Sequence, residues 1–129
     1  MMTTTKKFKQ LLLLASFALF GVSMAWGHGD PVAQRGGILQ VIDELDFELV
    51  VKDDTIDLYT SDDNHPVPSE KMSGTLTIMS DAEKSKVTLE PAGINRLRAK
   101  ATTAASGSRV IAIVTMPDGK SLAVQFAIP

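Results

Sequence analysis

The sequence predicts an all-β fold, a small antiparallel β-sandwich with an immunoglobulin-like outline and about seven strands. Apolar and polar residues alternate from Ile38 onward, as in the run Asp46–Val51 (DFELVV), and this period of two is typical of half-buried strands. Clusters of turn-forming residues separate the alternating runs. Short strands of this kind, joined by turns, favour two packed layers of antiparallel sheet.

The first four predicted strands each have one face buried in the core and one face exposed to solvent. Their inward residues are Phe47, Leu49 and Val51, then Ile56 and Leu58, then Leu76 and Ile78, then Val87 and Leu89. The turn chemistry of 52–54 (KDD) separates the first two of these strands. On this pattern, acidic residues such as Asp46, Glu48 and Asp57 belong to a solvated face. Read functionally, the strip of Asp43, Glu44, Asp46 and Glu48 is a cation-binding surface, and otherwise it maintains solubility.

Three more strands complete the prediction. We expect a strand over 96–100 with Leu97 and Ala99 inward, in preference to a short helix within 95–105. The run 110–114 (VIAIV) is apolar on both faces and therefore belongs in a central strand. It should form a hairpin with the last strand through the turn 117–120 (PDGK), because Pro presets its own φ and Gly accepts a positive φ.

The N-terminus has the chemistry of a cleavable export signal. Three lysines lie within residues 6–9, an apolar run follows over 11–20, and no acidic residue appears before Asp30. The apolar stretch is shorter than the roughly 20 residues that a membrane-spanning helix needs. We therefore expect a signal peptide at 1–27, a periplasmic location and no membrane span after cleavage. Cleavage after Ala25 is the alternative to cleavage after Gly27.

The remainder has the size of one domain. We expect a flexible, glycine-rich lead-in over 28–37 and the β-sandwich over 38–129. Cleavage removes three lysines and no acid from 13 basic and 15 acidic residues, which leaves 10 against 15 and a net charge of −5. This charge argues against a nucleic-acid partner. The sequence contains no cysteine, which excludes disulfides, thiolate metal sites and a cysteine nucleophile.

The two histidines are the main candidates for binding a transition metal. His65 follows Asp62 and Asp63 in the segment 61–66 (SDDNHP), and an imidazole with carboxylates suits zinc, copper or nickel. The alternative interpretation is a solvated turn, since Asp, Asn and Pro are turn-forming residues. His28 becomes the terminal residue if cleavage follows Gly27. Its α-amine and imidazole can then chelate Cu²⁺ together, although such termini are often unstructured.

Catalytic motifs are absent from the sequence. It has no Gly-x-Ser-x-Gly elbow, no His-Glu-x-x-His pair and no glycine-rich phosphate loop. A Ser-His-Asp arrangement would depend on His65, and no serine is marked as its partner. We therefore predict that the chain is not an enzyme.

A resemblance extends over residues 28–127. Its most similar parts are the strand 47–50 (FELV), the Leu58-Tyr59 pair, the stretch 89–97 (LEPAGINRL) and the turn 117–120. On these residues the chain resembles small periplasmic proteins of Gram-negative bacteria. It also resembles the short N-terminal domain that precedes the hairpin in some heavy-metal efflux periplasmic adaptor (membrane-fusion) proteins.

The resemblance implies a periplasmic accessory protein of a heavy-metal efflux or resistance system that binds a divalent or copper ion and an efflux-system protein. Copper and zinc are the expected metals, and His28, His65, Asp62 and Asp63 the expected ligands. The family is histidine-rich at its start, whereas this chain keeps only His28 there. The alternative is a non-enzymatic interaction module that docks another envelope protein without a metal.

Overall fold

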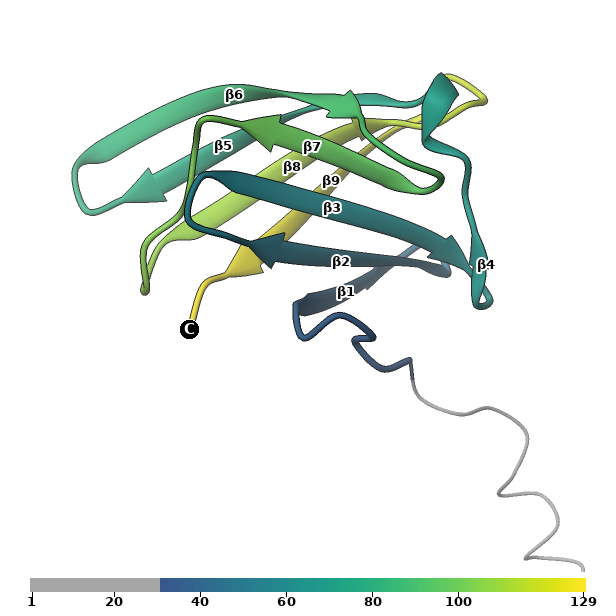
Figure 1. The fold of residues 1–129 in the computed structure, drawn as a ribbon, viewed down its shortest axis with the longest axis horizontal. Helices are drawn as coiled ribbons and strands as arrows, with labels where there is room; N and C mark the ends of the chain where they lie inside the picture. Colours follow the sequence, from purple (N-terminus) through teal and green to yellow (C-terminus); the bar gives the residue numbers. More distant parts are fainter. Residues whose placement is uncertain (1–30) are drawn as a thin grey trace, which may run out of the picture. The chain divides into compact units, whose positions relative to one another are not determined.

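Nine antiparallel β-strands make up the part of the chain that the computed structural model describes, residues 31–129 (Figure 1). The strands are β1 (Ile38–Ile42), β2 (Leu45–Val51), β3 (Thr55–Asp62), β4 (His65–Pro66), β5 (Ser73–Ser80), β6 (Glu83–Pro91), β7 (Arg96–Lys100), β8 (Arg109–Thr115) and β9 (Ser121–Ala127). A 3₁₀ turn, η2 (Ser69–Lys71), precedes β5. The predicted all-β antiparallel class is confirmed, with β1 and the two-residue β4 added to the seven expected strands.

The strands form one hydrogen-bonded path that curls back on itself. Its order is β1-β2-β3-β7-β6-β5-β8-β9, with β4 paired to β3 at the side. β6 crosses between the two walls, pairing with β5 over most of its length and with β7 only at Glu90 and Pro91. The two ends of the path, β1 and β9, lie next to each other, so Val32–Pro129 forms a sandwich that is nearly closed into a barrel (Figure 1).

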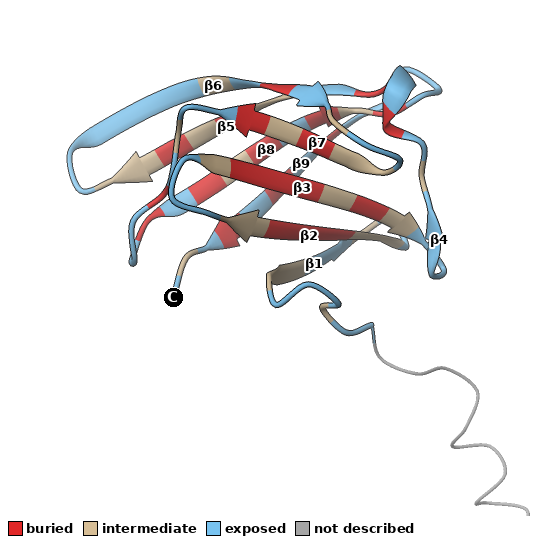
Figure 2. Ribbon diagram, in the orientation of Figure 1, coloured by how far each residue is buried: buried red, intermediate tan, exposed pale blue. Residues whose placement is uncertain are grey.

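Alternation places the core where the sequence predicts it. The buried bands of Figure 2 recur along the strands with intermediate or exposed positions between them. The largest fully buried side chains of this core are Phe47, Leu49, Ile56, Leu58, Leu76, Leu89, Leu97, Val110, Val114, Val124 and Phe126. Burying one such side chain contributes roughly 1.5–3 kcal/mol, and a domain without cysteines, and hence without disulfides, depends on this contribution.

Several local predictions are confirmed. β7 has the predicted bounds, with Leu97 and Ala99 buried. β8 is a central strand between β5 and β9. The β8–β9 turn is the expected one, because Gly119 has a φ of +88° and its N–H donates to the Met116 carbonyl at 2.8 Å. The β2–β3 turn is closed by the Lys52 N–H, which donates to the Thr55 carbonyl at 2.8 Å.

The prediction that Glu48 and Asp57 are exposed to solvent is wrong for both residues. Glu48 and Asp57 point to the outer side of the sheet as expected, but their exposed fractions are only 3% and 0%. The physical reason is that other parts of the chain cover the outer side of β2 and β3. Glu48 therefore does not belong to an exposed acidic strip. The predicted signal peptide (1–27) lies outside the described residues, as does His28, and the lead-in is described only from Pro31 onward.

Candidate functional site

The segment 62–65 is a tight hairpin turn. Asp62 ends β3 and pairs directly with His65 at the start of β4. Asp63 and Asn64 form the turn with φ values of 48° and 64°, which is the conformation of a two-residue hairpin turn that Asp and Asn tolerate well. All four side chains are exposed.

The structure brings together only part of the predicted metal site. Asp62 and His65 share a face of the hairpin because they are direct cross-strand partners, while Asp63 lies in the turn. Within residues 31–129, no group of three or more His, Asp or Glu side chains is placed to hold a metal ion. His28 lies outside the described residues. The described hairpin therefore offers one imidazole and one carboxylate side by side.

Asp57 is the centre of an ion-pair cluster on the outer face of β3 and β7. Its Oδ1 accepts a hydrogen bond from Arg98 Nε at 2.7 Å and its Oδ2 accepts one from Arg98 Nη2 at 3.0 Å. Lys52 Nζ lies 3.2 Å from Oδ2, and Arg96 Nη1 lies 4.0 Å from the same oxygen. Three cations from β7 and from the end of β2 thus surround one fully buried carboxylate.

These cations keep Asp57 ionised. Burial raises the pKa of the Asp57 carboxyl, but the hydrogen bonds and charges of Arg98 and Lys52 together outweigh burial and leave that pKa below its usual range. The hydrogen bond to Asp57 also raises the pKa of the Arg98 guanidinium. Asp57 therefore fixes the positions of cations on this face throughout the neutral pH range.

Glu48 is covered by the segment that precedes β1. Its Oε2 accepts hydrogen bonds from the N–H groups of Arg35 at 2.8 Å and Gly37 at 2.9 Å, and its Oε1 accepts one from the Gln34 N–H at 3.1 Å. The Arg35 guanidinium adds an ion pair, with Nη1 3.2 Å from Oε1. One carboxylate thus binds three backbone N–H groups of a single segment and one cation.

The same contacts set the ionisation of Glu48. Burial raises the pKa of the carboxyl, whereas the backbone N–H groups of Gly37, Arg35 and Gln34 and the Arg35 side chain lower it, with a net pKa below the usual range. Gly37 makes the close approach possible, because a Cβ there would collide with the Leu49 carbonyl oxygen. Glycine at position 37 is therefore needed to seat the segment on β2.

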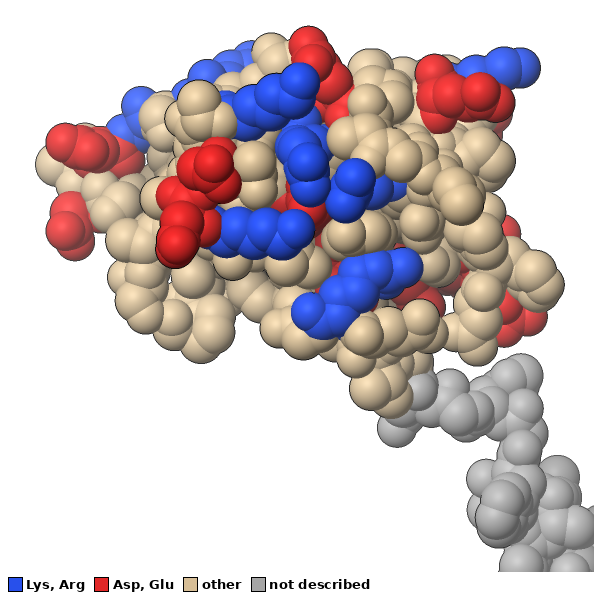
Figure 3. All heavy atoms as spheres, viewed as in Figure 1, with Lys and Arg blue, Asp and Glu red and all other residues tan. Residues whose placement is uncertain are grey.

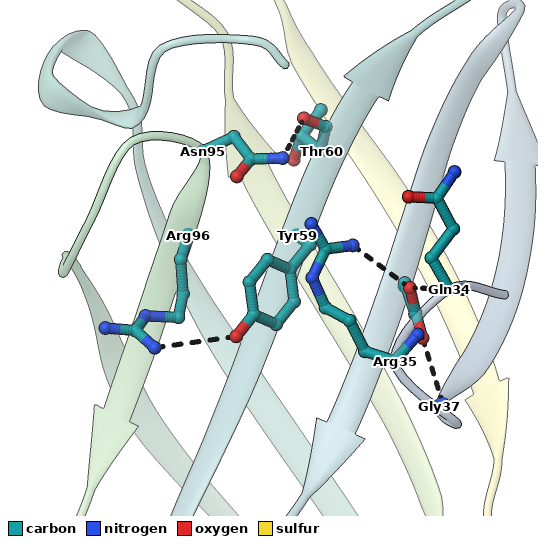
Figure 4. A network of polar contacts seen from close by, with 8 residues as sticks. Gln34, Arg35, Gly37, Tyr59, Thr60, Asn95 and Arg96 are labelled. Carbon is teal, nitrogen blue, oxygen red and sulfur yellow. Dashed lines mark hydrogen bonds and ion pairs between the residues drawn. The ribbon is translucent and has the colours of Figure 1, made fainter. Parts of the chain in front are cut away.

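Tyr59 lies between the two carboxylate clusters. The Arg35 guanidinium stacks 3.9 Å from the centre of the Tyr59 ring, and Arg96 Nη1 donates to the Tyr59 hydroxyl at 3.5 Å (Figure 4). The Arg96 Nε also donates to the Ala92 carbonyl at 2.6 Å. Cation–π stacking of this kind contributes about 0.5–1 kcal/mol at an exposed site, so both guanidinium groups are held in place.

We call the surface formed by Arg35, Lys52, Arg96, Arg98 and Lys100 the basic face. Figure 3 shows Lys and Arg side chains gathered in front of β3 and β7, with some acidic side chains directly beside them and others toward the edges of this view. Five cations outnumber the two carboxylates buried beneath them, although the domain as a whole is acidic. Arginines with spare N–H groups in fixed positions are suited to binding carboxylates or other anions.

A second feature is a pocket of about 360 Å³ at the end of the sandwich where the β1–β2, β3–β4 and β8–β9 turns meet. Its floor is apolar and its rim carries Asp43, Asp62, Asp118 and Lys120. Lys120 Nζ lies 3.3 Å from Asp43 Oδ2, and both side chains are exposed. Asp62, a predicted metal ligand, is thus a rim residue of this pocket.

Sequence reasoning missed the basic face and both buried carboxylates. One signal was present, because Arg96, Arg98 and Lys100 alternate with the inward Leu97 and Ala99 and so must share one outer face. Alternation could not predict which residues of other strands lie next to these cations, because Asp57 is 41 residues from Arg98 in the sequence.

Comparisons with known proteins add no relative. No protein-family model and no curated protein sequence matches the chain. Over residues 31–129, none of the helical segments has the length and apolar character required to cross a membrane.

Proposed function

We propose that this protein is a non-enzymatic interaction module of the bacterial periplasm, and that its basic face binds an acidic segment of an envelope protein. The observation that carries the proposal is the set of cations fixed around Asp57 and Tyr59. Location in the periplasm rests on the export signal that the sequence predicts.

The geometry favours binding because the cations are already ordered. Arg98 is held by two hydrogen bonds to Asp57, and Arg35 is held by Glu48 and the Tyr59 ring. Side chains that are fixed before binding lose less conformational entropy when a partner arrives. The Arg98 and Arg96 side chains are still 26% and 29% exposed, so an anionic partner can reach them.

The charge distribution favours an acidic protein segment as the partner. A local basic surface on a domain with net charge −5 steers an acidic segment to one face, while the remaining surface repels it. Nucleic acid is disfavoured because its long, uniform charge would also meet the acidic surfaces. The partner therefore matches only the area in front of β3 and β7.

Fluorescence anisotropy tests this proposal with a labelled 12-residue peptide rich in Glu and Asp. Neutralising two cations, Arg96→Gln with Lys100→Gln, should weaken binding about tenfold, because each exposed ion pair contributes up to about 1 kcal/mol. The matched control, Lys84→Gln with Lys86→Gln, makes the same charge change on exposed positions of β6. Equal losses for the two double variants would show that net charge, and not the basic face, attracts the peptide.

A second proposal is retained because Asp62 and His65 are cross-strand partners. It is the metal-binding accessory of an efflux system, with copper or zinc held by His65, Asp62 and Asp63 and completed by His28. Imidazole and carboxylate on one face are a suitable start for such a site. Two protein ligands bind a metal weakly, so this proposal depends on His28.

A further inference from the structure

We propose that the pocket at the turn end of the sandwich binds a primary alkylammonium group. Residues at the β3–β4 and β8–β9 turns line the pocket, and these turns lie at the end opposite to the β5–β6 turn (Figure 1). This site is distinct from the basic face and takes a ligand of the opposite charge. It is therefore tested independently of the basic face, while it shares Asp62 with the metal-binding proposal.

The size and floor of the pocket suit an alkyl chain. Its volume of about 360 Å³ is within the range of small-molecule sites. Leu45, Val67, Met116 and Leu122 line it, and Met116 and Leu122 also belong to the hydrophobic core. A short alkyl chain can thus exchange water for apolar contact on entering.

The rim suits a positive charge. It carries three carboxylates, those of Asp43, Asp62 and Asp118, against one ammonium, that of Lys120. Asp43 is paired with Lys120, which shows that an ammonium group fits at this rim. In the described part of the chain, Asp62 makes no ion pair, so its carboxylate remains to receive a second ammonium group.

β3 carries a buried hydroxyl close to this end of the sandwich, on Thr60, which is not one of the residues that line the pocket. Thr60 is two residues before Asp62 on β3 and therefore faces the same, inward side of the strand. It is fully buried, and its Oγ1 has no hydrogen-bond partner among the described residues. The ligand contacts of the pocket are therefore its apolar lining and its carboxylates, and not the Thr60 hydroxyl.

The chemistry distinguishes an ammonium ligand from the alternatives. An anion would meet three carboxylates and be repelled. A bare metal ion lacks the group of three ligands that residues 31–129 would have to supply. An alkylammonium uses both the apolar floor and the negative rim, so we expect it to bind more tightly than a neutral molecule of the same shape.

The test is an NMR titration of isotope-labelled protein purified after expression of the full chain. The probes are pentylammonium, pentan-1-ol and pentanoate, which share a chain and differ in charge. We expect saturable shifts at Leu45 and Val67 with pentylammonium at a Kd of about 1 mM. Pentan-1-ol should bind at least about tenfold more weakly, and pentanoate should cause no saturable shift. Equal affinity for the amine and the alcohol would overturn the proposal.

Variants locate the site. Asp62→Asn should weaken pentylammonium binding about threefold to fivefold, the effect of one exposed ion pair. Asp81→Asn makes the same change in the β5–β6 turn and should leave the affinity unchanged. Val67→Phe should abolish binding by filling the pocket. Equal affinities of the Asp62→Asn and Asp81→Asn variants, with wild-type binding by the Val67→Phe variant, would place the probe elsewhere and contradict the assignment.

One further arm identifies the source of the ammonium. A lysine capped at both ends as an amide carries the same alkylammonium chain on a peptide backbone. Tighter binding of pentylammonium would assign the pocket to free small amines. Tighter binding of the capped lysine would assign it to a lysine side chain of a partner. Either outcome supports an alkylammonium site, and failure of both molecules to bind would refute it.

Discussion

Asp57 and Arg98 form a two-point ion pair between directly paired positions of β3 and β7, with distances of 2.7 and 3.0 Å. The pair lies on the outer side of the sheet, yet Asp57 is fully buried because Arg98, Arg96 and Lys52 cover it. A charge-assisted pair of this geometry is stronger than a neutral hydrogen bond. It joins two strands that are far apart in sequence.

Asp57→Asn should destabilise the domain by about 2 kcal/mol, less than the loss of a partner from a wholly buried pair, because the cations it leaves can turn toward water. Urea denaturation gives the free energy of unfolding. Asp53→Asn, at an exposed position of the neighbouring turn, is the control and should have no measurable effect. An unchanged urea midpoint for the Asp57→Asn variant would mean that desolvation of Asp57 cancels its pairing.

Acid should unfold the domain through Asp57 and Glu48. The folded state lowers the pKa of both carboxyls, so their contribution to stability is complete above the ordinary carboxyl pKa of about 4 and is lost as the pH falls through the lowered values. The melting temperature measured from pH 7 to pH 2 should therefore drop mainly below about pH 4. The slope should be smaller in a Glu48→Gln, Asp57→Asn double variant, and an equal slope would contradict this origin.

Gly37→Ala should release the segment that covers Glu48. The added Cβ collides with the Leu49 carbonyl oxygen and comes within 3.0 Å of Glu48 Cγ, so we expect a loss of about 2 kcal/mol, as for other overpacking changes. Amide hydrogen exchange should show faster exchange at Gln34 and Arg35. Gln34→Ala is the control, because Gln34 binds Glu48 through its backbone N–H. Unchanged exchange at Arg35 in the Gly37→Ala variant would contradict a tight fit.

The metal proposal makes its own prediction. Protein that begins at His28 should bind Cu²⁺ more tightly than about 10 μM, an affinity of roughly 7 kcal/mol, and should lose this binding in a His28→Ala, His65→Ala double variant. Calorimetric titration with Cu²⁺, Zn²⁺ and Ni²⁺ measures it, beside intact mass to establish the N-terminus. Weaker binding by protein that begins at His28, or unchanged affinity in the double variant, would contradict a metal site that contains His28 and His65.

Alternation in the sequence was sufficient to predict which residues face the core, because a strand's side chains change sides at every residue. Phe47, Leu97 and Phe126 are buried for this reason. Alternation could not predict that the side chains of Glu48 and Asp57 are buried as well. Their cover comes from the segment before β1 and from β7, and only the register of β3 with β7 places Arg98 opposite Asp57.

The pocket was beyond sequence reasoning for a related cause. Asp43, Asp62 and Asp118 lie in or beside separate turns. The sequence predicted the turn at 117–120 and offered a turn at 61–66, but it placed Asp43 and Glu44 in an acidic strip, whereas they form the β1–β2 turn with positive φ values. The gathering of the three turns at one end follows from the curling of the whole strand path, which brings β1 next to β9. Local turn chemistry contains no information about this closure.

Thr60→Val should raise the stability of the domain. Thr60 is fully buried and its Oγ1 has no partner among the described residues, while its backbone N–H donates to the Asn95 carbonyl and its carbonyl accepts from Val67 and Asn95. Valine keeps the shape and the backbone bonds but removes the unpaired hydroxyl, which costs about 1–3 kcal/mol when buried. We therefore expect a gain of about 1 kcal/mol in the free energy of unfolding, measured with urea.

The control for this change is Thr88→Val at an exposed position of β6. It tests how much of the gain comes from the preference of valine for strands, because both changes have the same effect on strand propensity. A gain at Thr60 that exceeds the gain at Thr88 isolates the cost of the buried hydroxyl. Destabilisation by Thr60→Val would instead mean that the hydroxyl binds a water molecule inside the sandwich, since only a satisfied hydroxyl contributes to stability there.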